Sequence, residues 1–588
     1  EMINGDWSSD VCSSDLEYKW AAITTPVFML LEVAMETIIP LLMASIIDEG
    51  VNKGDTHHIY VMGIWMIFAA LFALICGCLG AKYGSKASMG LGKNLRKAMF
   101  RNIQTYSFAN IDKFSTAGLV TRMTTDVTNI QNAFMMILRM AMRAPASIIC
   151  AMAMSFFISP QLATIYLIAV ILLGGFLIFI STKAMKYFEK AFEKYDELNE
   201  SVQENVSAIR VVKAYVRENY EKKRFSKAAE NIYKVFTKAE SLVVCNTPLM
   251  QFTVYACILL ISWLGAHMVV GNELSTGDLM ALLTYCMNIL MNLMMLSMVF
   301  VMISLSLASA RRICEVLNEE STLHNPDDPI MDVPDGSIKF DHVSFRYSKS
   351  SETPILSDIN LEIRSGETIG IIGGTGSSKS SLVNLISRLY DAGSGSVIVG
   401  GHDVREYDMD TLRNQVAVVL QQNVLFSGSI LDNLRWGDKD ATDEQCIEAC
   451  KMACADEFIE TFPDKYDTHI EQGGTNVSGG QKQRLCIARA LLKKPKVLIL
   501  DDSTSAVDTA TDAKIRASFA KAIPGTTKLI IAQRISSVMD ADKIIVMNNG
   551  CVDGFDTHEN LLKNNKIYRE VYDAQTNGGG DFDEGGAA

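Results

Sequence analysis

The sequence lacks the excess of positive charge that nucleic-acid-binding proteins carry. Lysine and arginine together number 54, against 67 aspartates and glutamates, and the formal net charge is -13. A protein that neutralises a phosphate backbone needs a basic face. The charge balance therefore argues against a nucleic-acid partner.

The sequence also lacks the cysteine and histidine spacing of a metal site. Thirteen cysteines are scattered along the chain, and those in long apolar runs are expected to act as small hydrophobic side chains. Cys446, Cys450 and Cys454 are spaced to share one face of a helix, but no histidine or fourth thiol accompanies them at ligand spacing. Core packing is the preferred interpretation of these three thiols, and a metal site is the alternative.

Residues 1–16 lack both the basic start and the apolar centre of a signal peptide, and they show no helical pattern. Asp10 to Leu16 can be back-translated into a sequence that resembles a common sequencing-library adapter. We therefore expect that residues 1–16 are not native and that the native sequence begins near Glu17.

Long hydrophobic runs are present in the first half of the chain. Six of them, near 21–47, 59–81, 140–158, 161–181, 244–270 and 278–308, are each long enough to cross a membrane. Lysine and arginine crowd the second-to-third and fourth-to-fifth connections, which are therefore expected to be cytoplasmic. The pattern predicts an α-helical six-span domain over 17–320 in the plasma (inner) membrane, with both termini cytoplasmic. We expect a short transverse element in each connection, near 118–126 and near 204–217.

A proline-rich stretch separates this region from a second one. Residues 321–337 include HNPDDPIMDVPDG, which breaks helices and strands and marks a linker. From 338 to 575, short β-rich runs alternate with helical patterns, which predicts an α/β domain. The tail from 576 to 588 is glycine-rich and acidic, and we expect it to be disordered.

A phosphate-binding loop follows the first buried strand of this α/β region. The strand Ile369 to Ile372 leads into GGTGSSKSS, and a helical run follows. Glycines there let backbone N–H groups converge on phosphate oxygens. Lys379 should reach the β- and γ-phosphates, and Ser380 should bind Mg²⁺. The predicted ATP-binding residues of the loop are Gly373, Thr375, Gly376, Ser377, Ser378, Lys379, Ser380 and Ser381.

One position of this loop departs from the usual pattern, because Ser378 stands where a glycine normally precedes the lysine. If that position requires a positive φ, serine costs on the order of 1 kcal/mol there, which weakens ATP binding without abolishing it.

A second motif identifies the family. Asn476 to Arg484 reads NVSGGQKQR ahead of a helical run, and SGGQ is the signature of the ABC ATPases. With the phosphate loop and the six spans, the chain resembles an ABC exporter half-transporter of the multidrug or lipid exporter type, from Glu17 to about Gln575. The resemblance implies a six-span transmembrane domain fused to an α/β P-loop nucleotide-binding domain, with ATP and Mg²⁺ as cofactors.

The resemblance also assigns individual roles. Tyr347 resembles the aromatic residue that stacks on adenine, with a core strand residue as the alternative. Gln421, rather than Gln422, resembles the glutamine that contacts Mg²⁺ and the transmembrane domain, and Asp501 the carboxylate that holds the magnesium water shell. Ser505 to Asp508 resembles the loop that contacts the opposite subunit. Ser478, Gly479, Gly480 and Gln481 would grip the γ-phosphate of an ATP bound by that subunit.

Two residues depart from the family at the positions that drive hydrolysis. Asp502 replaces the glutamate that positions the attacking water, and Gln533 replaces the histidine that senses the γ-phosphate. The shorter carboxylate withdraws the base by about one bond length, and a displacement of about 1 Å can cost roughly 100-fold in rate. Because the SGGQ motif is retained, we expect a degenerate ATP site in a heterodimer whose partner keeps the glutamate and the histidine.

The expected function is therefore one subunit of an ATP-driven exporter. A regulatory or structural partner with a pseudo-ATPase site, and an ATP-gated channel, are the alternatives. Glu32 and Glu36 lie one turn apart in the first span, where they would form an acidic patch for cationic or zwitterionic cargo, or a helix–helix polar contact. A small amphipathic molecule or a lipid is the expected cargo.

Overall fold

The structure is a computed structural model, and it describes residues 18–347, 353–502 and 507–577. The chain divides into two compact units. Residues up to 104 and residues 115–319 form the first unit, and residues 105–114 and those from 320 onward form the second. The predicted non-native segment 1–16 lies outside the described residues, as does the predicted tail 576–588 apart from Thr576 and Asn577, which are helical.

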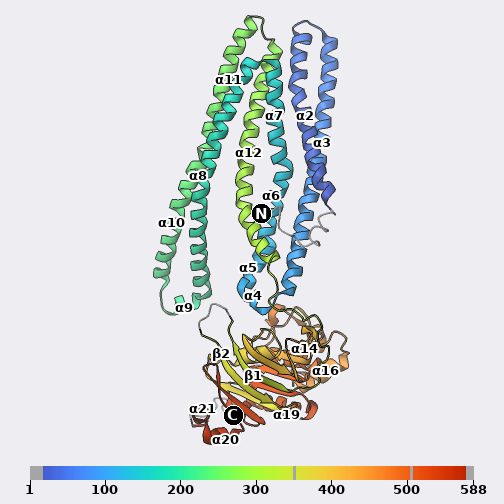
Figure 1. The fold of residues 1–588 in the computed structure, drawn as a ribbon. Coiled ribbons are helices and arrows are strands. Elements are labelled where there is room, and N and C mark those ends of the chain that lie inside the picture. The colour runs from blue at the N-terminus through green and yellow to red at the C-terminus, as the bar shows by residue number, and fades with distance from the viewer. Residues whose placement is uncertain (1–17, 348–352, 503–506, 578–588) are drawn as a thin grey trace. The chain divides into compact units, whose positions relative to one another are not determined.

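The first unit is helical (Figure 1). Within the described residues, six helical segments are long and apolar enough to cross a membrane, as the sequence predicts. The helical elements of the unit are α2 (Lys19–Ser45), η1 (Ile46–Val51), α3 (Thr56–Thr105), α5 (Thr116–Thr121), η2 (Arg122–Asp126), α6 (Val127–Met136), η3 (Ile137–Ala141), α7 (Met142–Ile158), α8 (Pro160–Ser207), α9 (Ile209–Ala214), α10 (Glu218–Val244), α11 (Asn246–Val270) and α12 (Thr276–Leu317).

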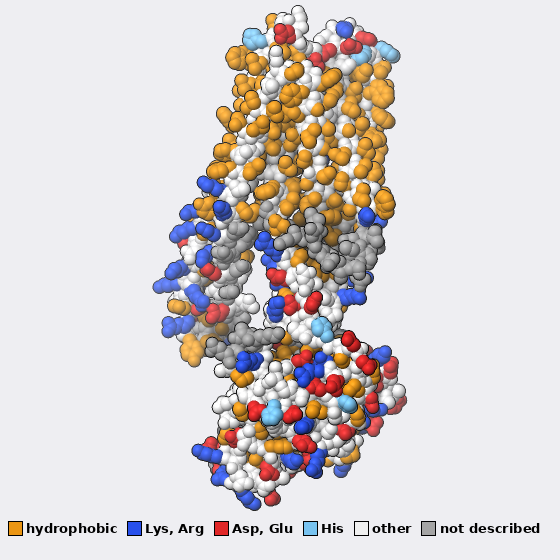
Figure 2. All heavy atoms as spheres, in the orientation of Figure 1, with side chains coloured by type: hydrophobic (Ala, Val, Ile, Leu, Met, Phe, Trp, Pro, Cys, Tyr) orange, Lys and Arg blue, Asp and Glu red, His pale blue; other side chains and the backbone are white. Residues whose placement is uncertain are grey.

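Hydrophobic side chains cover much of the length of these helices (Figure 2). Lysine and arginine gather on the part of the unit that carries α9 and α10, whereas the spans themselves are apolar. A helix that presents apolar side chains outward suits a hydrocarbon solvent, which shows that this unit is built for a membrane.

Two buried tyrosines form hydrogen bonds between helices in the interior of the helical unit. The Tyr166 hydroxyl donates to the carbonyl oxygen of Leu282 at 2.9 Å, and the Tyr285 hydroxyl donates to that of Thr37 at 2.6 Å. Both rings are almost completely buried. Buried tyrosines need such a partner for the hydroxyl, and each bond ties α12 to another helix of the unit.

The first predicted transverse element is wrong in position. Residues 118–126 belong to a helix that continues from Thr116 to Ile158, through the π-helical turn η2. The break lies earlier, at Ser115, whose φ of 50° ends one helix and whose side chain caps the next. The separate short helix is α4 (Phe108–Phe114), which is part of the second unit. The second predicted element, near 204–217, contains the short helix α9.

Helix α4 is joined to the second unit by defined contacts. The Tyr390 hydroxyl donates to Asp112 Oδ2 at 2.7 Å, and the ring of Phe108 lies 6.1 Å from that of Tyr390. The side chain of Asn110 donates to the carbonyl oxygen of Glu320 at 3.0 Å. Sequence patterns showed no glycine or proline in α4, so the helix could not be separated from its neighbours by inspection.

The second unit contains the predicted α/β fold. Its larger sheet has the order β12-β11-β3-β10-β9-β6, and the strands from β11 to β6 run parallel. A smaller antiparallel sheet has the order β2-β1-β4-β5, and β7 pairs with β8. The strands are β1 (Ile338–Phe345), β2 (Leu356–Ile363), β3 (Thr368–Gly373), β4 (Ser394–Val399), β5 (His402–Asp403), β6 (Val416–Val419), β7 (Gly428–Ser429), β8 (His469–Ile470), β9 (Val497–Asp501), β10 (Thr527–Ile531), β11 (Lys543–Asn548) and β12 (Cys551–Asp556).

The parallel strands are apolar runs because helices and loops cover both faces of the sheet. All five residues of β9 and all five of β10 are buried. The helices of the unit, besides α4, are α13 (Lys379–Ile386), α14 (Met409–Gln415), α15 (Ile430–Leu434), α16 (Asp443–Met452), α17 (Asp456–Ile459), α18 (Gly479–Leu492), α19 (Thr509–Ala522), α20 (His558–Asn564) and α21 (Lys566–Asn577), with short 3-10 turns η4 (Lys465–Asp467), η5 (Gln472–Gly474) and η6 (Ile535–Ser537).

The three cysteines of helix α16 and the turn after it pack as the sequence predicts. Cys446 and Cys450 are fully buried in the hydrophobic core, and Cys454 packs against the same core. Thiols in such surroundings act as hydrophobic side chains, so core packing accounts for their spacing.

Candidate nucleotide-binding site

The phosphate loop joins strand β3 to helix α13. Ser378 lies directly before the helix with φ 72° and ψ 26°, which is the left-handed region. The condition under which serine is costly there is thus met, because a residue with a Cβ is strained by about 1 kcal/mol relative to glycine at a positive φ. Gly376, with φ 81°, meets the same demand without strain.

The ammonium group of Lys379 lies against the loop. Its Nζ donates to the carbonyl oxygens of Gly373 and Gly374 at 2.8 and 2.9 Å, and to Ser377 Oγ at 3.3 Å. Burial lowers the pKa of Lys379, and the charges of Asp501 and Asp502 partly oppose that shift. A cation held at the mouth of a glycine-rich loop suits an anionic ligand such as a phosphate chain.

Three neighbouring strands bring the other polar residues to one edge of the sheet. Ile531 at the end of β10 is paired with Asp501 at the end of β9, and β10 also pairs with β3, which leads into the phosphate loop. The carboxyl ends of parallel strands meet at the same edge, where ligands of such sheets bind. This register explains how residues from three separated motifs reach one site.

Asp501 faces the phosphate loop. The Ser380 hydroxyl donates to Asp501 Oδ1 at 3.0 Å, and burial raises the pKa of this carboxyl. Among the described residues, no three His, Cys, Asp or Glu side chains are grouped to hold a metal ion. A hydroxyl and one carboxylate fit Mg²⁺, which takes few protein ligands and completes its octahedron with phosphate oxygens and water. The donor set thus fits a magnesium nucleotide and does not fit an all-protein metal site.

Asp502 is bonded by a glutamine. Gln533 Nε2 donates to Asp502 Oδ2 at 2.7 Å. Burial raises the pKa of Asp502, and the side chains of Gln533 and Gln421 partly oppose that shift. The backbone is left-handed, with φ 49°. Gln421 thus lies near Asp502, and its contact with Mg²⁺ stays a prediction.

Tyr347 lies beside the start of helix α13. Its hydroxyl forms a hydrogen bond of 2.9 Å with Ser381 Oγ. Phe345 and Tyr390 contact the ring edge-on, with centroids 4.8 and 5.0 Å away. The side chain is 43% exposed, so the ring is fixed by its neighbours while part of its surface remains open for stacking.

The signature residues form the start of helix α18. Ser478 caps the helix by accepting from the backbone N–H of Gln481 at 3.3 Å, and the Gln481 side chain accepts from the Ser478 backbone N–H at 2.8 Å. This reciprocal capping leaves Gly479 and Gly480 in the first turn, where backbone N–H groups have no partner inside the helix.

Asp508, which ends the predicted subunit-contacting loop, caps helix α19. Its Oδ1 accepts from the backbone N–H of Thr511 at 2.9 Å, and this bond lowers the pKa of the carboxyl. Ser505, at the start of the same loop, lies outside the described residues.

The acidic residues predicted for the first span are paired with a cation from another helix. Arg143 Nη2 in α7 lies 2.7 Å from Glu36 Oε1 and 3.7 Å from Glu32 Oε1, both in α2. The arginine was not part of the sequence prediction, because no spacing rule relates α2 to α7. The pairing favours a helix–helix contact over an open acidic patch.

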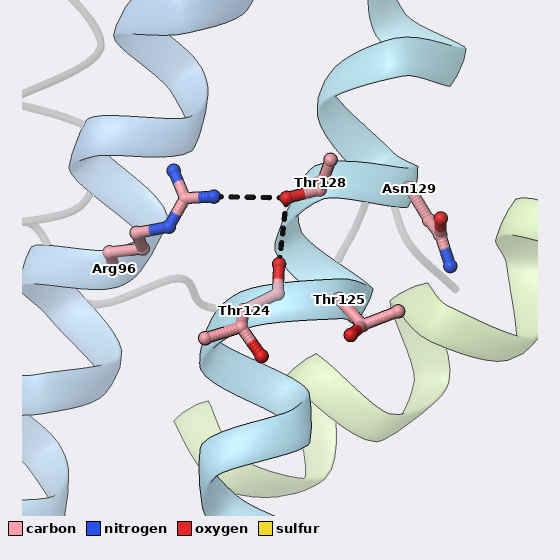
Figure 3. A pocket seen from close by; sticks show the side chains of 5 residues that line it. All are labelled: Arg96, Thr124, Thr125, Thr128 and Asn129. Atoms are coloured by element: carbon pink, nitrogen blue, oxygen red, sulfur yellow. Dashed lines mark hydrogen bonds between the residues drawn. The ribbon is translucent and has the colours of Figure 1, made fainter.

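An open pocket of about 370 Å³ lies in the helical unit, and no motif of the sequence predicts it. Arg96, Thr124, Thr125, Thr128 and Asn129 line it, with Arg96 from α3 reaching toward the threonines (Figure 3). Arg96 donates to Thr128 Oγ1 at 3.1 Å and to the carbonyl oxygen of Met123 at 3.2 Å. The pocket is wide open and most of its hydroxyl groups already bond to the backbone, so it has few groups left to hold a ligand.

The sequence also missed Gln575, which lies in the last described helix, α21. Its Oε1 accepts from the backbone N–H of Ile535 at 2.8 Å, and its Nε2 donates to the carbonyl oxygen of Gln533 at 2.8 Å. About forty residues separate the two segments, and no motif joins them. Only the fold brings them together.

Comparison with known proteins extends the similarity over nearly the whole chain. A family model described as the ABC transporter transmembrane region matches residues 23–311, and one described as ABC transporter matches residues 356–505. An uncharacterized ABC transporter ATP-binding protein of Bacillus subtilis is 36% identical over 549 residues, which are 93% of this chain and 95% of that protein.

Two further likenesses concern a transporter with a named cargo and a solved structure. An ATP-dependent lipid A-core flippase of Syntrophus aciditrophicus is 31% identical over 484 residues, which are 82% of this chain and 80% of that protein. A bacterial Atm1-family ABC exporter, solved with ATP bound, has a similar fold with a TM-score of 0.79 at 24% identity, and the match covers 95% of this chain and 98% of that one.

Proposed function

The chain belongs to the ABC transporter family, with the fused membrane and ATPase domains of an exporter half-transporter, and we propose that it is the degenerate-site subunit of a heterodimeric exporter. In this proposal the chain holds ATP and Mg²⁺ at its own phosphate loop and hydrolyses that ATP slowly. Its SGGQ residues complete a second ATP site, at which a partner half-transporter with glutamate and histidine carries out efficient hydrolysis.

The observation that carries the proposal is the contact between Asp502 and Gln533. The residue at the position of the water-activating carboxylate is one methylene shorter than glutamate, and the residue at the position of the γ-phosphate sensor bonds to it at 2.7 Å. A base that is displaced by about 1 Å can lose roughly 100-fold in rate. Lys379, Ser380 and Asp501, by contrast, are the residue types expected for binding phosphate and Mg²⁺, and Ser380 bonds to Asp501.

Each residue of the phosphate-loop site has one proposed role in binding ATP and Mg²⁺. Lys379 binds the phosphate chain, Ser380 and Asp501 orient Mg²⁺ and its water, and Tyr347 stacks on the base. Gln421 reaches Asp502 and is placed to contact Mg²⁺. The magnesium ion, when bound, neutralises charge between the β- and γ-phosphates. The strain at Ser378 weakens ATP binding without removing any phosphate contact.

The signature residues, Ser478 to Gln481, support a role for the chain in binding the partner's ATP. Ser478 and Gln481 form a complete cap, and the first-turn N–H groups of α18 stay available for an anion. Asp508 would contact the partner from its place at the start of α19. The signature residues thus keep their cap, whereas the hydrolytic residues Asp502 and Gln533 are altered. This is the combination expected if this chain binds ATP and its partner hydrolyses it.

The charged residues of the helical unit support a proposed orientation in the membrane and a proposed cargo. Lysine and arginine gather at the α9 and α10 end of the helical unit (Figure 2), which favours cytoplasmic termini and nucleotide domain in the plasma membrane. A small amphipathic molecule or a lipid remains the proposed cargo. Because Arg143 neutralises Glu36 and approaches Glu32, these carboxylates support a packing role better than recognition of a cation.

The proposal is tested with the full-length chain alone, reconstituted in lipid nanodiscs. The wild type should hydrolyse MgATP slowly, and the double variant Asp502→Glu with Gln533→His should raise the rate about 10- to 100-fold, because both hydrolytic groups are restored. Adding Lys379→Ala to the double variant should remove the gain. Brisk, magnesium-dependent hydrolysis by the wild type alone would overturn the proposal.

Transport is tested with the chain co-expressed with a half-transporter encoded beside it. Vesicle uptake should require ATP, and replacing the partner's presumed catalytic glutamate by glutamine should abolish it. If uptake is unaffected by that change, an ATP-driven cycle is excluded. Dissipative flux without accumulation would instead favour a channel.

A further inference from the structure

Helix α21 is firmly attached to the nucleotide-binding unit. Tyr568 is completely buried, and its hydroxyl forms a hydrogen bond of 2.7 Å with His558 Nδ1. The backbone N–H of Tyr568 donates to Asn565 Oδ1 at 2.8 Å, and Ile567 and Val571 pack against the hydrophobic core. The helix can therefore hold other segments in place.

The segment that α21 holds is the loop after strand β10, residues 532–538. Gln575 bonds to this loop through both atoms of its amide group, as an acceptor from the Ile535 N–H and as a donor to the Gln533 carbonyl. A side-chain amide that bonds two backbone groups two residues apart fixes the course of the backbone between them. The side chain of Gln575 is otherwise exposed, so core packing does not explain its position.

A second contact fixes the far end of the same loop. The Ser537 hydroxyl donates to Asp512 Oδ2 at 2.9 Å, and Asp512 is a buried residue of helix α19. The loop is thus held at its end by α19, which follows the proposed subunit-contacting loop. Near its start, Arg534 Nη1 also donates to Thr509 Oγ1 of α19 at 3.2 Å, the Ala532 N–H donates to the Ile371 carbonyl at 3.3 Å, and Gln575 of α21 bonds to Gln533 and Ile535. Gln575 is the contact nearest to Gln533.

Gln533 connects the loop held by Gln575 to Asp502 in the candidate site. Its backbone carbonyl is bound by Gln575, while its side-chain Nε2 donates to Asp502 Oδ2 at 2.7 Å. A chain of hydrogen bonds therefore runs from α21 through Gln575 and Gln533 to Asp502. If the backbone at 533 is released, the Gln533 amide loses the fixed starting point from which it reaches Asp502.

We propose that Gln575 is a positioning residue that sets the Gln533 amide beside Asp502, so that the C-terminal helix controls how long ATP stays at this chain's own site. The inference rests on the proposed retention of ATP at that site. Gln575 touches neither the nucleotide nor Mg²⁺ in this scheme, and it acts through Gln533 alone.

The test uses the full-length chain in nanodiscs with MgATP labelled by a fluorescent ribose group, chased with unlabelled ATP in a stopped-flow instrument. Gln575→Ala should release the label about 5-fold faster, which is the effect expected from the loss of one to two hydrogen bonds. Gln575→Glu keeps the acceptor for Ile535 but turns a carboxylate oxygen toward the Gln533 carbonyl oxygen, so it should accelerate release at least as much as Gln575→Ala. The matched control is Thr576→Ala, whose hydroxyl bonds only to the helix backbone at Tyr572.

Coupling separates a positioning role from a general loss of structure. Gln533→Ala should accelerate release by a similar factor, and the double variant with Gln575→Ala should be no faster than Gln533→Ala alone. The thermal midpoint should be unchanged in the single Gln575 variants. Full additivity of the two substitutions, or release from Gln575→Ala equal to that from Thr576→Ala, would overturn the inference.

Hydrogen exchange distinguishes this outcome from a failure of the proposed function. Without nucleotide, the peptide covering residues 532–538 should exchange faster in Gln575→Ala than in the wild type and in Thr576→Ala, because the Ile535 N–H loses its acceptor. Brisk ATP hydrolysis by the wild type would reject the proposed function while leaving the exchange result to decide on Gln575. Unchanged exchange at this peptide would reject the positioning role, whatever the wild type does with ATP.

Discussion

The half of the nucleotide domain that would hold the chain's own ATP differs from the half that would face the partner. On the first side, Ser378 and Asp502 are non-glycine residues with φ of 72° and 49°, and Gln533 bonds to Asp502 where a phosphate sensor is expected. On the second side, Ser478 and Asp508 each cap a helix with its regular hydrogen bond. The three altered residue types, Ser378, Asp502 and Gln533, all lie on the first side. The proposed division of the two sides between different ATP sites would explain this difference.

The strongest test of this comparison places a negative charge at the signature. Gly479→Asp adds a carboxylate to the first turn of α18, where acidic residues stabilise a helix, so the chain should fold normally. The same carboxylate would repel a γ-phosphate held by the partner. ATPase activity of the co-expressed pair should fall about 100-fold or more, as when a donor to a developing negative charge is removed.

The neutral substitution Gly479→Ser is the matched control and should reduce the activity much less. Lys379→Ala, on the other half, should also reduce the activity of the pair by less than Gly479→Asp, because this chain's own ATP is retained and not turned over efficiently. Equal losses from Gly479→Asp and Lys379→Ala would break the comparison and indicate two equivalent sites.

A smaller effect is expected at the strained loop position. Ser378→Gly removes the Cβ at φ 72° and should tighten binding of MgATP to the full-length chain about 5-fold, which corresponds to about 1 kcal/mol. A titration with fluorescent ATP in nanodiscs measures the dissociation constant. Gly376→Ala, at φ 81°, introduces the same strain and should weaken binding by a similar factor. Unchanged affinity in Ser378→Gly would show that the strain is not relieved in the ATP-bound state.

Motifs confined to one stretch of chain were predictable from the sequence. The strand, loop and helix around Lys379 have local signals, since an apolar strand, glycines and a helical run follow one another within twenty residues. The positive φ at Ser378 was predictable for the same reason. The six spans were predictable because each is a long apolar run, which no soluble element of this length imitates.

Contacts between distant segments were not predictable in the same way. Arg143 could not be predicted as the partner of Glu36, because helix packing and not sequence spacing brings α7 to α2. No sequence pattern pointed to Gln575. Its two hydrogen bonds are to backbone groups, and every residue type has these groups, so the partner residues cannot be recognised from their identity. Helix α4 was missed because Ser115, an ordinary residue with φ 50°, ends it where glycine or proline would have marked the break.

The smallest expected effect concerns two carboxyl groups, one in each half, whose pKa values shift in opposite directions. Burial raises the pKa of Asp502 above 3.8, whereas the bond from the Thr511 N–H lowers that of Asp508 below 3.8. The folded chain binds protons more readily than the unfolded chain at Asp502, so the ionised carboxyl opposes folding as the pH rises through the raised pKa. Ionised Asp508 favours folding, and that contribution is lost as the pH falls through its lowered pKa.

Neutral substitutions at these two carboxyl groups should therefore change stability in opposite directions. Without nucleotide at pH 7.5, Asp502→Asn should raise the thermal midpoint of the full-length chain by about 1–2 °C, and Asp508→Asn should lower it by about as much. Asparagine still accepts a hydrogen bond at both positions and is a good helix cap, so only the charge changes. The Asp502 difference should shrink as the pH falls through the raised pKa of that carboxyl, whereas the Asp508 difference should shrink only at lower pH, as the pH falls through its lowered pKa. Shifts of equal sign, or shifts that do not depend on pH, would show that the two halves do not differ in how they hold a negative charge.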